Sequence, residues 1–210
     1  MRVSELNSAV DSYKINQASL KAEADSKTYF GFWVYLMTDC VLFASLFATF
    51  AVLHANTFNG PSAHSLFSLP YALAETLILL TSSFTCGLAI LAAQNKAKRL
   101  VLFWLLITFL LGLAFLVLEF REFANFVNQG DSWRRSGFLS SYFTLVATHG
   151  LHITIGLLWI GTMMFQVLKK GLNRITVRQL TLMSLFWHFL DLIWIFIFSV
   201  VYLISGGLNI

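Results

Sequence analysis

The sequence predicts an all-α integral membrane protein built as a bundle of five transmembrane helices. Only 11% of the 210 residues are charged, 58% are hydrophobic, and the mean hydropathy is +0.74. A soluble domain carries about 25% charged residues, and one of this size could not bury so much apolar surface. Five long apolar runs are the second observation, and all 14 basic residues lie outside them. The composition therefore excludes a soluble globular protein and a disordered chain.

The sequence divides into a polar tail followed by five apolar spans. Residues 1–28 are polar and balanced in charge, so we expect an N-terminal tail rather than a secretory signal. Residues 29–210 form one transmembrane domain. Its spans are expected at about 29–55, 71–93, 100–120, 138–168 and 180–204. Each run has the roughly 20 residues that cross the hydrocarbon core, and lipid requires backbone hydrogen bonds to be satisfied within a helix.

Lysine and arginine in the short loops predict the orientation. The polar tail and the loops 94–99 and 169–179 hold 11 of the 14 basic residues, and the loops on the other side hold 3. Cytoplasmic loops are enriched in these residues. We therefore expect a cytoplasmic N-terminus and a C-terminus on the opposite side.

Acidic residues inside the runs are unexpected, because an ionised carboxylate in the bilayer costs several kcal/mol. They are Asp39, Glu75, Glu119 and Asp191. Asp39 and Asp191 lie about ten residues from a helix end, so we expect them to be buried against helices of this chain or of a partner. Glu75 and Glu119 lie near the ends of their runs, where lipid head groups would surround them.

Helical rise sorts the polar side chains into two layers. The inner layer holds Asp39, His188 and Asp191, and the outer layer holds Glu75, Glu119, Glu122 and His149. Spacings of three residues put pairs of these side chains on shared helix faces. The pairs are His188 with Asp191, Glu119 with Glu122, and His149 with His152.

A stripe of Trp187, Asp191 and Trp194 recurs at helical spacing and should face protein rather than lipid. It could form a proton-linked or lipid-head-group site with aromatic walls. We favour a structural interpretation instead. In it, a pair between His188 and Asp191 fixes helix packing, and the tryptophans fill volume.

A metal or haem site in the fourth run is the weaker interpretation of His149 and His152. A metal site would need further ligands at matching depth, and an H-E-x-x-H pattern is absent. A haem would need histidines on facing helices, and His188 is expected nearer the cytoplasmic side than His149, which strains that pairing. Gly150 and Thr154 form a pair of small residues typical of closely packed membrane helices. The histidines are therefore expected to make hydrogen bonds between helices.

Five stretches carry a family resemblance. They are Gly31–Cys40 (GFWVYLMTDC), Glu75–Leu77 (ETL), Glu119–Phe123 (EFREF), Thr148–His152 (THGLH) and Leu185–Trp194 (LFWHFLDLIW). From about Lys27 to the C-terminus the chain resembles subunit III of the haem–copper oxidases, of the cytochrome o ubiquinol oxidase type. The seven-helix members have two more helices where this chain has its polar tail.

The resemblance implies a non-catalytic subunit of a proton-pumping complex that oxidises ubiquinol and reduces oxygen to water. It also implies that the haems and copper belong to the catalytic subunit I and that this chain holds none. Further partners implied by the resemblance are subunit II and a small subunit IV. The resemblance also implies bound phospholipid, support of proton uptake, location in a bacterial inner membrane and a periplasmic C-terminus. It does not imply binding of nucleic acid. Motif positions make candidates of Asp39, Glu119, Glu122, His149, His152, His188 and Asp191, with Trp187 and Trp194 beside them. Glu75 ranks lower, because its motif belongs to the quinol oxidase branch.

Two alternatives follow from the residues alone. A small proton-coupled transporter could use the intramembrane carboxylates, although internal repeats and broken-helix signals are absent. A haem carrier similar to cytochrome b is the other alternative.

Overall fold

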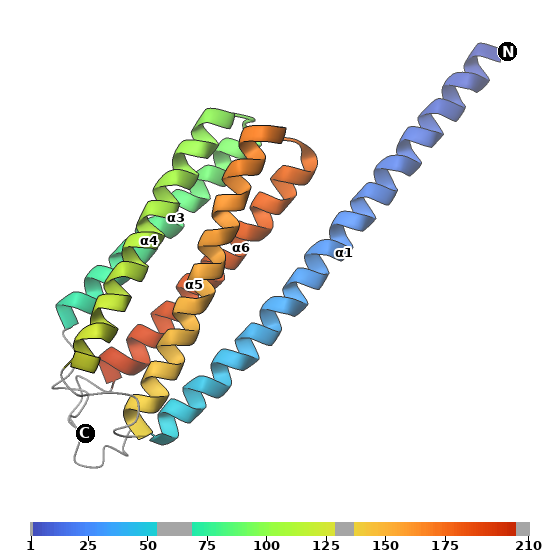
Figure 1. The fold of residues 1–210 in the computed structure, drawn as a ribbon. Coiled ribbons are helices and arrows are strands. Elements are labelled where there is room, and N and C mark those ends of the chain that lie inside the picture. Colours follow the sequence, from blue (N-terminus) through green and yellow to red (C-terminus); the bar gives the residue numbers. More distant parts are fainter. Residues whose placement is uncertain (1, 54–68, 129–136, 205–210) are drawn as a thin grey trace. The chain divides into compact units, whose positions relative to one another are not determined.

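The computed structural model of the chain describes residues 2–53, 69–128 and 137–204 (Figure 1). These residues include five helices that are long and apolar enough to cross a membrane, which confirms the predicted fold class. Most of the first outer loop lies outside the described residues. So do Arg134 and Arg135, two of the three basic residues counted on the outer side.

The helices overlap the five predicted spans. They are α1 (Arg2–Leu53), α3 (Leu69–Gln94), α4 (Lys98–Asn128), α5 (Gly137–Lys170) and α6 (Arg174–Ile197), and a π-helical segment (Phe198–Ile204) continues the last one. The polar tail is not separated from the first span, because α1 is already helical at Arg2.

The chain divides into two compact units, Met1–Val41 and Leu42–Ile210. The described part of the first unit is helical throughout. The second unit contains the end of α1 and all the later helices, and every contact discussed below lies within it.

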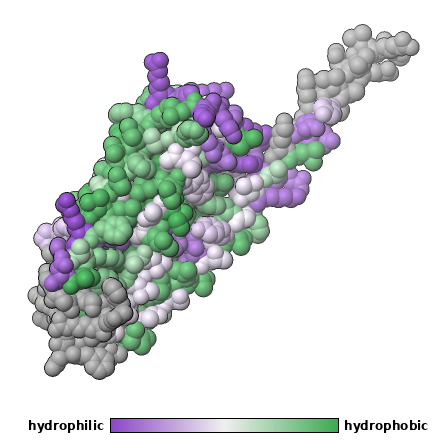
Figure 2. All heavy atoms as spheres, viewed as in Figure 1, coloured by the Kyte–Doolittle hydropathy of each residue, from purple (hydrophilic) through white to green (hydrophobic). Residues whose placement is uncertain are grey.

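Four helices of the second unit form a bundle in which α3 packs against α4 and α6, and α5 packs against the same two helices (Figure 1). Leu105, Phe115 and Phe186 are among the side chains buried in the core. Large apolar side chains such as Phe84, Leu158 and Leu192 are exposed on its outside. Figure 2 shows hydrophobic residues covering much of the visible bundle surface, with hydrophilic ones gathered toward its ends. Such a surface is suited to lipid or to other membrane helices rather than to water.

Basic residues gather at the end of the bundle where α4 begins and α5 ends. Gly171 takes a φ of 70°, a left-handed conformation that ends α5, and Asn173 caps α6 by accepting a hydrogen bond from the Thr176 amide at 2.8 Å. Lys98 donates to the Leu168 carbonyl at 2.9 Å. The loops before α4 and after α5 therefore lie at the same end, as expected from their shared positive charge.

Candidate functional site

Three carboxyl groups from two helices come together in the second unit. Glu75 on α3 and Glu119 and Glu122 on α4 are 0%, 4% and 8% exposed. They are close enough for mutual electrostatic interaction. Neither oxygen of Glu75 or Glu119 has a hydrogen-bond partner within the described part of the chain. We call Glu75, Glu119 and Glu122 the carboxyl cluster.

The burial of Glu75 and Glu119 corrects the expectation that lipid head groups surround them. Position along a helix predicted their depth, but the side of the helix on which they lie decides whether they meet lipid. Both point toward neighbouring helices instead. Burying a charged carboxyl without a partner is costly, so this environment favours the neutral form of the group.

The Glu119 carboxyl packs directly against α5 at Gly150. A Cβ atom at position 150 would lie 2.9 Å from each of the two Glu119 carboxyl oxygens. Gly150 therefore allows a close approach, as expected for a small residue in a membrane helix. The group that lies against it is the Glu119 carboxyl rather than the backbone of another helix.

His149 lies in an aromatic enclosure. Its ring is 0% exposed and stacks on Trp194 at 5.3 Å, with an interplanar angle of 30°. Phe115 meets it edge-on at 6.1 Å, and Phe43 lies 6.3 Å away. Neither ring nitrogen has a hydrogen-bond partner among the residues described. The predicted role of His149 in hydrogen bonding between helices is therefore not seen, and its contacts are aromatic ones.

His152 and Trp194 extend this enclosure. The His152 ring lies 5.2 Å from Phe43, so both histidines contact one phenylalanine and share a helix face as predicted. Its Nδ1 lies 2.7 Å from the Thr148 carbonyl oxygen. Trp194 donates from Nε1 to the Thr76 hydroxyl at 3.1 Å and thereby joins α6 to α3.

Trp187 of the predicted stripe packs tightly against three neighbouring helices. A Cβ at Gly112 of α4 would lie 2.8 Å from its ring, and one at Gly156 of α5 would lie 2.9 Å from it. Its Nε1 donates to the Ser82 hydroxyl of α3 at 3.0 Å. One indole thus contacts all three neighbouring helices of the bundle.

The predicted pair between His188 and Asp191 is not formed. Nδ1 of His188 lies 2.5 Å from the hydroxyl of Ser83 on α3, and the His188 side chain is exposed. Asp191 is 5% exposed, and its carboxyl also lies beside Ser83. Both side chains therefore meet the same serine of α3, and the imidazole hydrogen-bonds to that serine instead of to the carboxyl on its own helix.

Burial supports the expectation for the stripe as a whole. Trp187, Asp191 and Trp194 are 1%, 5% and 1% exposed, so the stripe faces protein. Asp39, in the first unit, is 8% exposed. Within the ranges 2–53, 69–128 and 137–204, no group of three or more His, Cys, Asp or Glu side chains is placed to hold a metal ion.

Sequence reasoning missed the partners of the tryptophans. Gly112, Gly156, Ser82 and Thr76 make the contacts that hold the two indoles. Glycines in the middle of apolar spans were the available signal, because small residues mark close approaches between membrane helices. The pairing itself could not be seen before the helices were placed.

Replacing Gly156 with leucine is expected to destabilise the bundle, because the new side chain would overlap the Trp187 ring. Overpacking of this kind typically costs about 1–3 kcal/mol and should lower the thermal midpoint of the purified protein. Gly161→Leu on the same helix is the control, since nothing lies within 4 Å of a Cβ there. Equal midpoints for the two variants would contradict the enclosure of Trp187.

Comparison with known proteins places the chain in a family. The sequence profile of cytochrome c oxidase subunit III matches residues 18–206. Cytochrome bo(3) ubiquinol oxidase subunit 3 of Pseudomonas aeruginosa is 53% identical over 184 residues, which cover 88% of each chain. The protein of the same name from Buchnera aphidicola is 47% identical over 178 residues, 85% of this chain and 92% of the relative. Cytochrome c oxidase subunit 3 of Bacillus sp. PS3 is 46% identical over 177 residues, 84% of this chain and 86% of the relative. The chain therefore belongs to the cytochrome c oxidase subunit III family.

Proposed function

We propose that the chain is a non-catalytic integral subunit of a proton-pumping cytochrome o ubiquinol oxidase, the complex that passes electrons from ubiquinol to oxygen. The observation that carries the proposal is the 53% identity to a cytochrome bo(3) ubiquinol oxidase subunit 3, over 88% of both chains. The quinol-branch motif at Glu75–Leu77 supports the choice of quinol as electron donor.

The proposed work of the chain is to pack against the catalytic subunit I and stabilise it. The haems and copper are assigned to that subunit, and subunits II and IV complete the complex. Exposed apolar side chains such as Phe84 and Leu192 give the bundle a surface that could meet membrane helices of a partner. The same surface could meet phospholipid.

A bacterial inner membrane is the proposed location, with the N-terminus in the cytoplasm and the C-terminus in the periplasm. The bias of 11 basic residues against 3 supports this orientation. Cysteine-accessibility labelling at the exposed residues Tyr13 and Val127, in intact cells and in inverted vesicles, tests it. Labelling of position 13 from the periplasm would overturn the assignment.

The buried polar residues are proposed to brace the helices and to contact lipid, with support of proton uptake as an added role in the complex. His149 stacks on Trp194, and Glu119 packs on Gly150, so both make contacts between helices. A second function as a small proton-coupled transporter has no support among the relatives, whose names are those of oxidase subunits.

Co-purification is the decisive experiment. An affinity-tagged chain, extracted in mild detergent from membranes of its host, is expected to bring down a haem-containing subunit. The preparation should oxidise a short-chain ubiquinol and leave reduced cytochrome c unoxidised. The chain expressed alone is expected to show no haem absorbance. A stoichiometric haem band from the isolated chain, or substrate flux in liposomes containing only this chain, would overturn the proposal.

A further inference from the structure

A groove on the bundle surface, between α3 and α6, places polar side chains in the middle of two membrane-spanning helices. It has a volume of about 510 Å³ and is lined by Ser83 and His188 together with apolar residues. We call it the α3–α6 groove. The packing role proposed for the chain does not account for it. Its apolar lining residues are Leu80, Phe84, Gly87, Leu88 and Leu91.

Both polar side chains lie far from the ends of their helices. His188 is 14 residues beyond Arg174, the first residue of α6, which corresponds to about 21 Å along the helix axis. Ser83 is 11 residues before Gln94, the last residue of α3, or about 16 Å along the axis. The hydrocarbon core of a bilayer is about 30 Å thick, so the two side chains lie near its middle. A charged lipid head group would be costly at this depth.

The polar side of the groove is a chain of three side chains. Nδ1 of His188 lies 2.5 Å from the Ser83 hydroxyl oxygen, and the buried Asp191 carboxyl lies beside the same serine. The His188 side chain is exposed, and its Nε2 has no hydrogen-bond partner among the residues that the structure describes. A polar nitrogen left unpaired in hydrocarbon is costly. The groove therefore offers a ligand one hydrogen-bonding position.

This chain of side chains can meet either an acceptor or a donor. A neutral imidazole has one donor nitrogen and one acceptor nitrogen. When the Ser83 hydroxyl donates to Nδ1 of His188, Nε2 carries the proton and can donate to a carbonyl oxygen. When Nδ1 donates to Ser83 instead, Nε2 can accept from a hydroxyl group. Burial favours the neutral form of the Asp191 carboxyl, which has both a donor and an acceptor and can satisfy the serine in either arrangement.

The walls of the groove are apolar and uncharged. Phe84 is 68% exposed and contributes an aromatic ring, and a Cβ at Gly87 would meet nothing within 4 Å, so the floor of the groove is open. Leu80 and Leu91 lie 11 residues apart on α3, which extends the apolar lining over about 16 Å. No Lys, Arg, Asp or Glu is found among the described residues that line it. A neutral ring with hydrogen-bonding groups and a long apolar tail fits such a groove.

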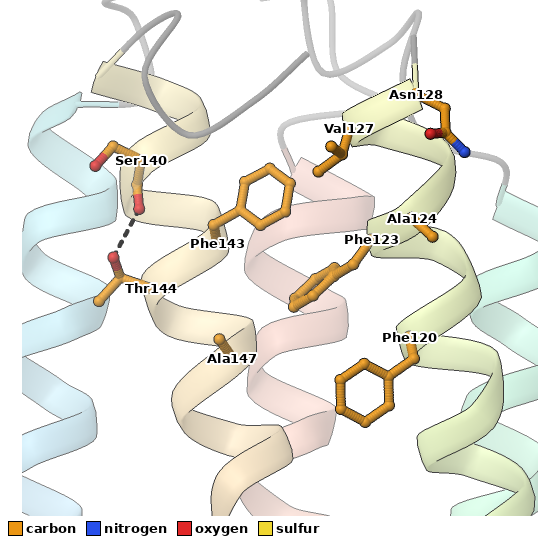
Figure 3. Close-up of a pocket in the computed structure, with 9 residues that line it drawn as sticks. All are labelled: Phe120, Phe123, Ala124, Val127, Asn128, Ser140, Phe143, Thr144 and Ala147. Carbon is orange, nitrogen blue, oxygen red and sulfur yellow. Dashed lines mark hydrogen bonds between the residues drawn. The ribbon is translucent and has the colours of Figure 1, made fainter. Parts of the chain in front are cut away.

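Two other hollows on the bundle lack this polar chain. Figure 3 shows one between α4 and α5, of about 670 Å³, in which the Thr144 hydroxyl donates to the Ser140 carbonyl of its own helix at 2.8 Å. The other, of about 460 Å³, is lined by Gly161 and Phe165 among others. No titratable side chain is found among the described residues that line either hollow. The hollow at Gly161 therefore serves as a control for the α3–α6 groove.

We propose that the α3–α6 groove binds ubiquinone and ubiquinol, with His188 hydrogen-bonded to an oxygen of the ring and the isoprenoid tail lying along α3. The two arrangements of His188 and Ser83 suit the carbonyl oxygen of the quinone and the hydroxyl group of the quinol. The choice of ubiquinone rests on the proposed function, which makes ubiquinol the substrate of the complex. Its oxidation is assigned to the haem-containing subunit, so the proposal concerns binding alone.

Photolabelling of the tagged complex tests the site. A short-chain ubiquinone with an azide on its ring is equilibrated with the purified complex and illuminated, and labelled peptides are identified by mass spectrometry. We expect label in this chain between Leu80 and Leu91 or around His188. Excess unlabelled ubiquinone and ubiquinol should displace it, and an isoprenoid alcohol with the same tail should not. An absence of displaceable label in these segments, as when a partner helix or a phospholipid covers the groove, would overturn the proposal.

Substitutions at two positions locate the effect in the groove. His188→Phe keeps a ring but removes the hydrogen bond, and should reduce the label in this chain about threefold to tenfold, as expected for one neutral hydrogen bond. His188→Gln offers an amide and should recover part of the loss. Gly87→Leu fills the floor and should reduce the label more than tenfold. Gly161→Leu is the matched control, since a Cβ there also meets nothing within 4 Å. Equal labelling of the two leucine variants would contradict the assignment.

Haem content and oxidation of ubiquinol are measured on the same samples. A complex that contains haem and oxidises ubiquinol, but takes no displaceable label in this chain, refutes only the groove. A tagged chain that purifies without a haem subunit refutes the proposed function. The competition experiment on wild type remains decisive if a variant fails to assemble.

Discussion

Alanine at position 187 is expected to give the largest loss of stability of any single substitution in the bundle. Trp187 is 1% exposed, contacts Gly112 and Gly156 through its ring, and donates a hydrogen bond to Ser82. Truncating a buried tryptophan typically costs about 3–5 kcal/mol. Lipid is as apolar as the protein interior, so the loss here arises from the cavity and the missing dispersion contacts.

The thermal midpoint of the purified protein and the yield of assembled complex measure this loss. Trp104→Ala is the control, because Trp104 is half-buried and its indole makes a ring contact with its neighbour Phe103. Trp187→Phe separates volume from hydrogen bonding and should recover most of the stability. If Trp187→Ala and Trp104→Ala lowered the midpoint equally, the central position assigned to Trp187 would be wrong.

A second large effect is expected at His149, where two variants distinguish packing from polar chemistry. His149→Ala removes a ring that contacts Trp194, Phe115 and Phe43 and should cost about 3 kcal/mol, as for other buried aromatic rings. His149→Phe keeps a ring in the enclosure and is expected to cost less than about 1.5 kcal/mol, as volume-conserving changes do.

Unfolding midpoints and oxidase turnover are measured together on these variants. A bracing role predicts that His149→Phe keeps near-wild-type values of both. Retained stability with lost turnover would show that the imidazole nitrogens are needed and would contradict the bracing role. His152→Ala is the companion variant, since that side chain shares Phe43 but is slightly more exposed, at 8%.

The number of spans and the fold class were predictable because the bilayer leaves few choices. A run of about 20 apolar residues must be helical to satisfy its backbone. All five runs became helices. Polar residues within these runs also predicted which side of a helix faces protein, since Asp191 and the tryptophans on the same stripe are buried.

Contacts between individual side chains could not be predicted from the sequence, unlike the number of spans and the fold class. Lipid-facing and protein-facing sides of these helices are both apolar, as Phe84 and Phe115 illustrate, so periodicity does not reveal how each helix is turned. His188 was expected to pair with Asp191 on its own helix and instead contacts Ser83 on α3. Glu119 was expected near head groups and is buried against Gly150.

The sequence by itself thus determined the five membrane-spanning helices, the grouping of the basic loops and the residues that carry the family resemblance, because each depends on composition along one segment. Tertiary structure decided which helix each polar group meets: the carboxyl cluster, the enclosure of His149, and the glycines around Trp187. These depend on the rotation and close approach of helices far apart in the chain, which dispersion contacts and small residues set once the helices pack.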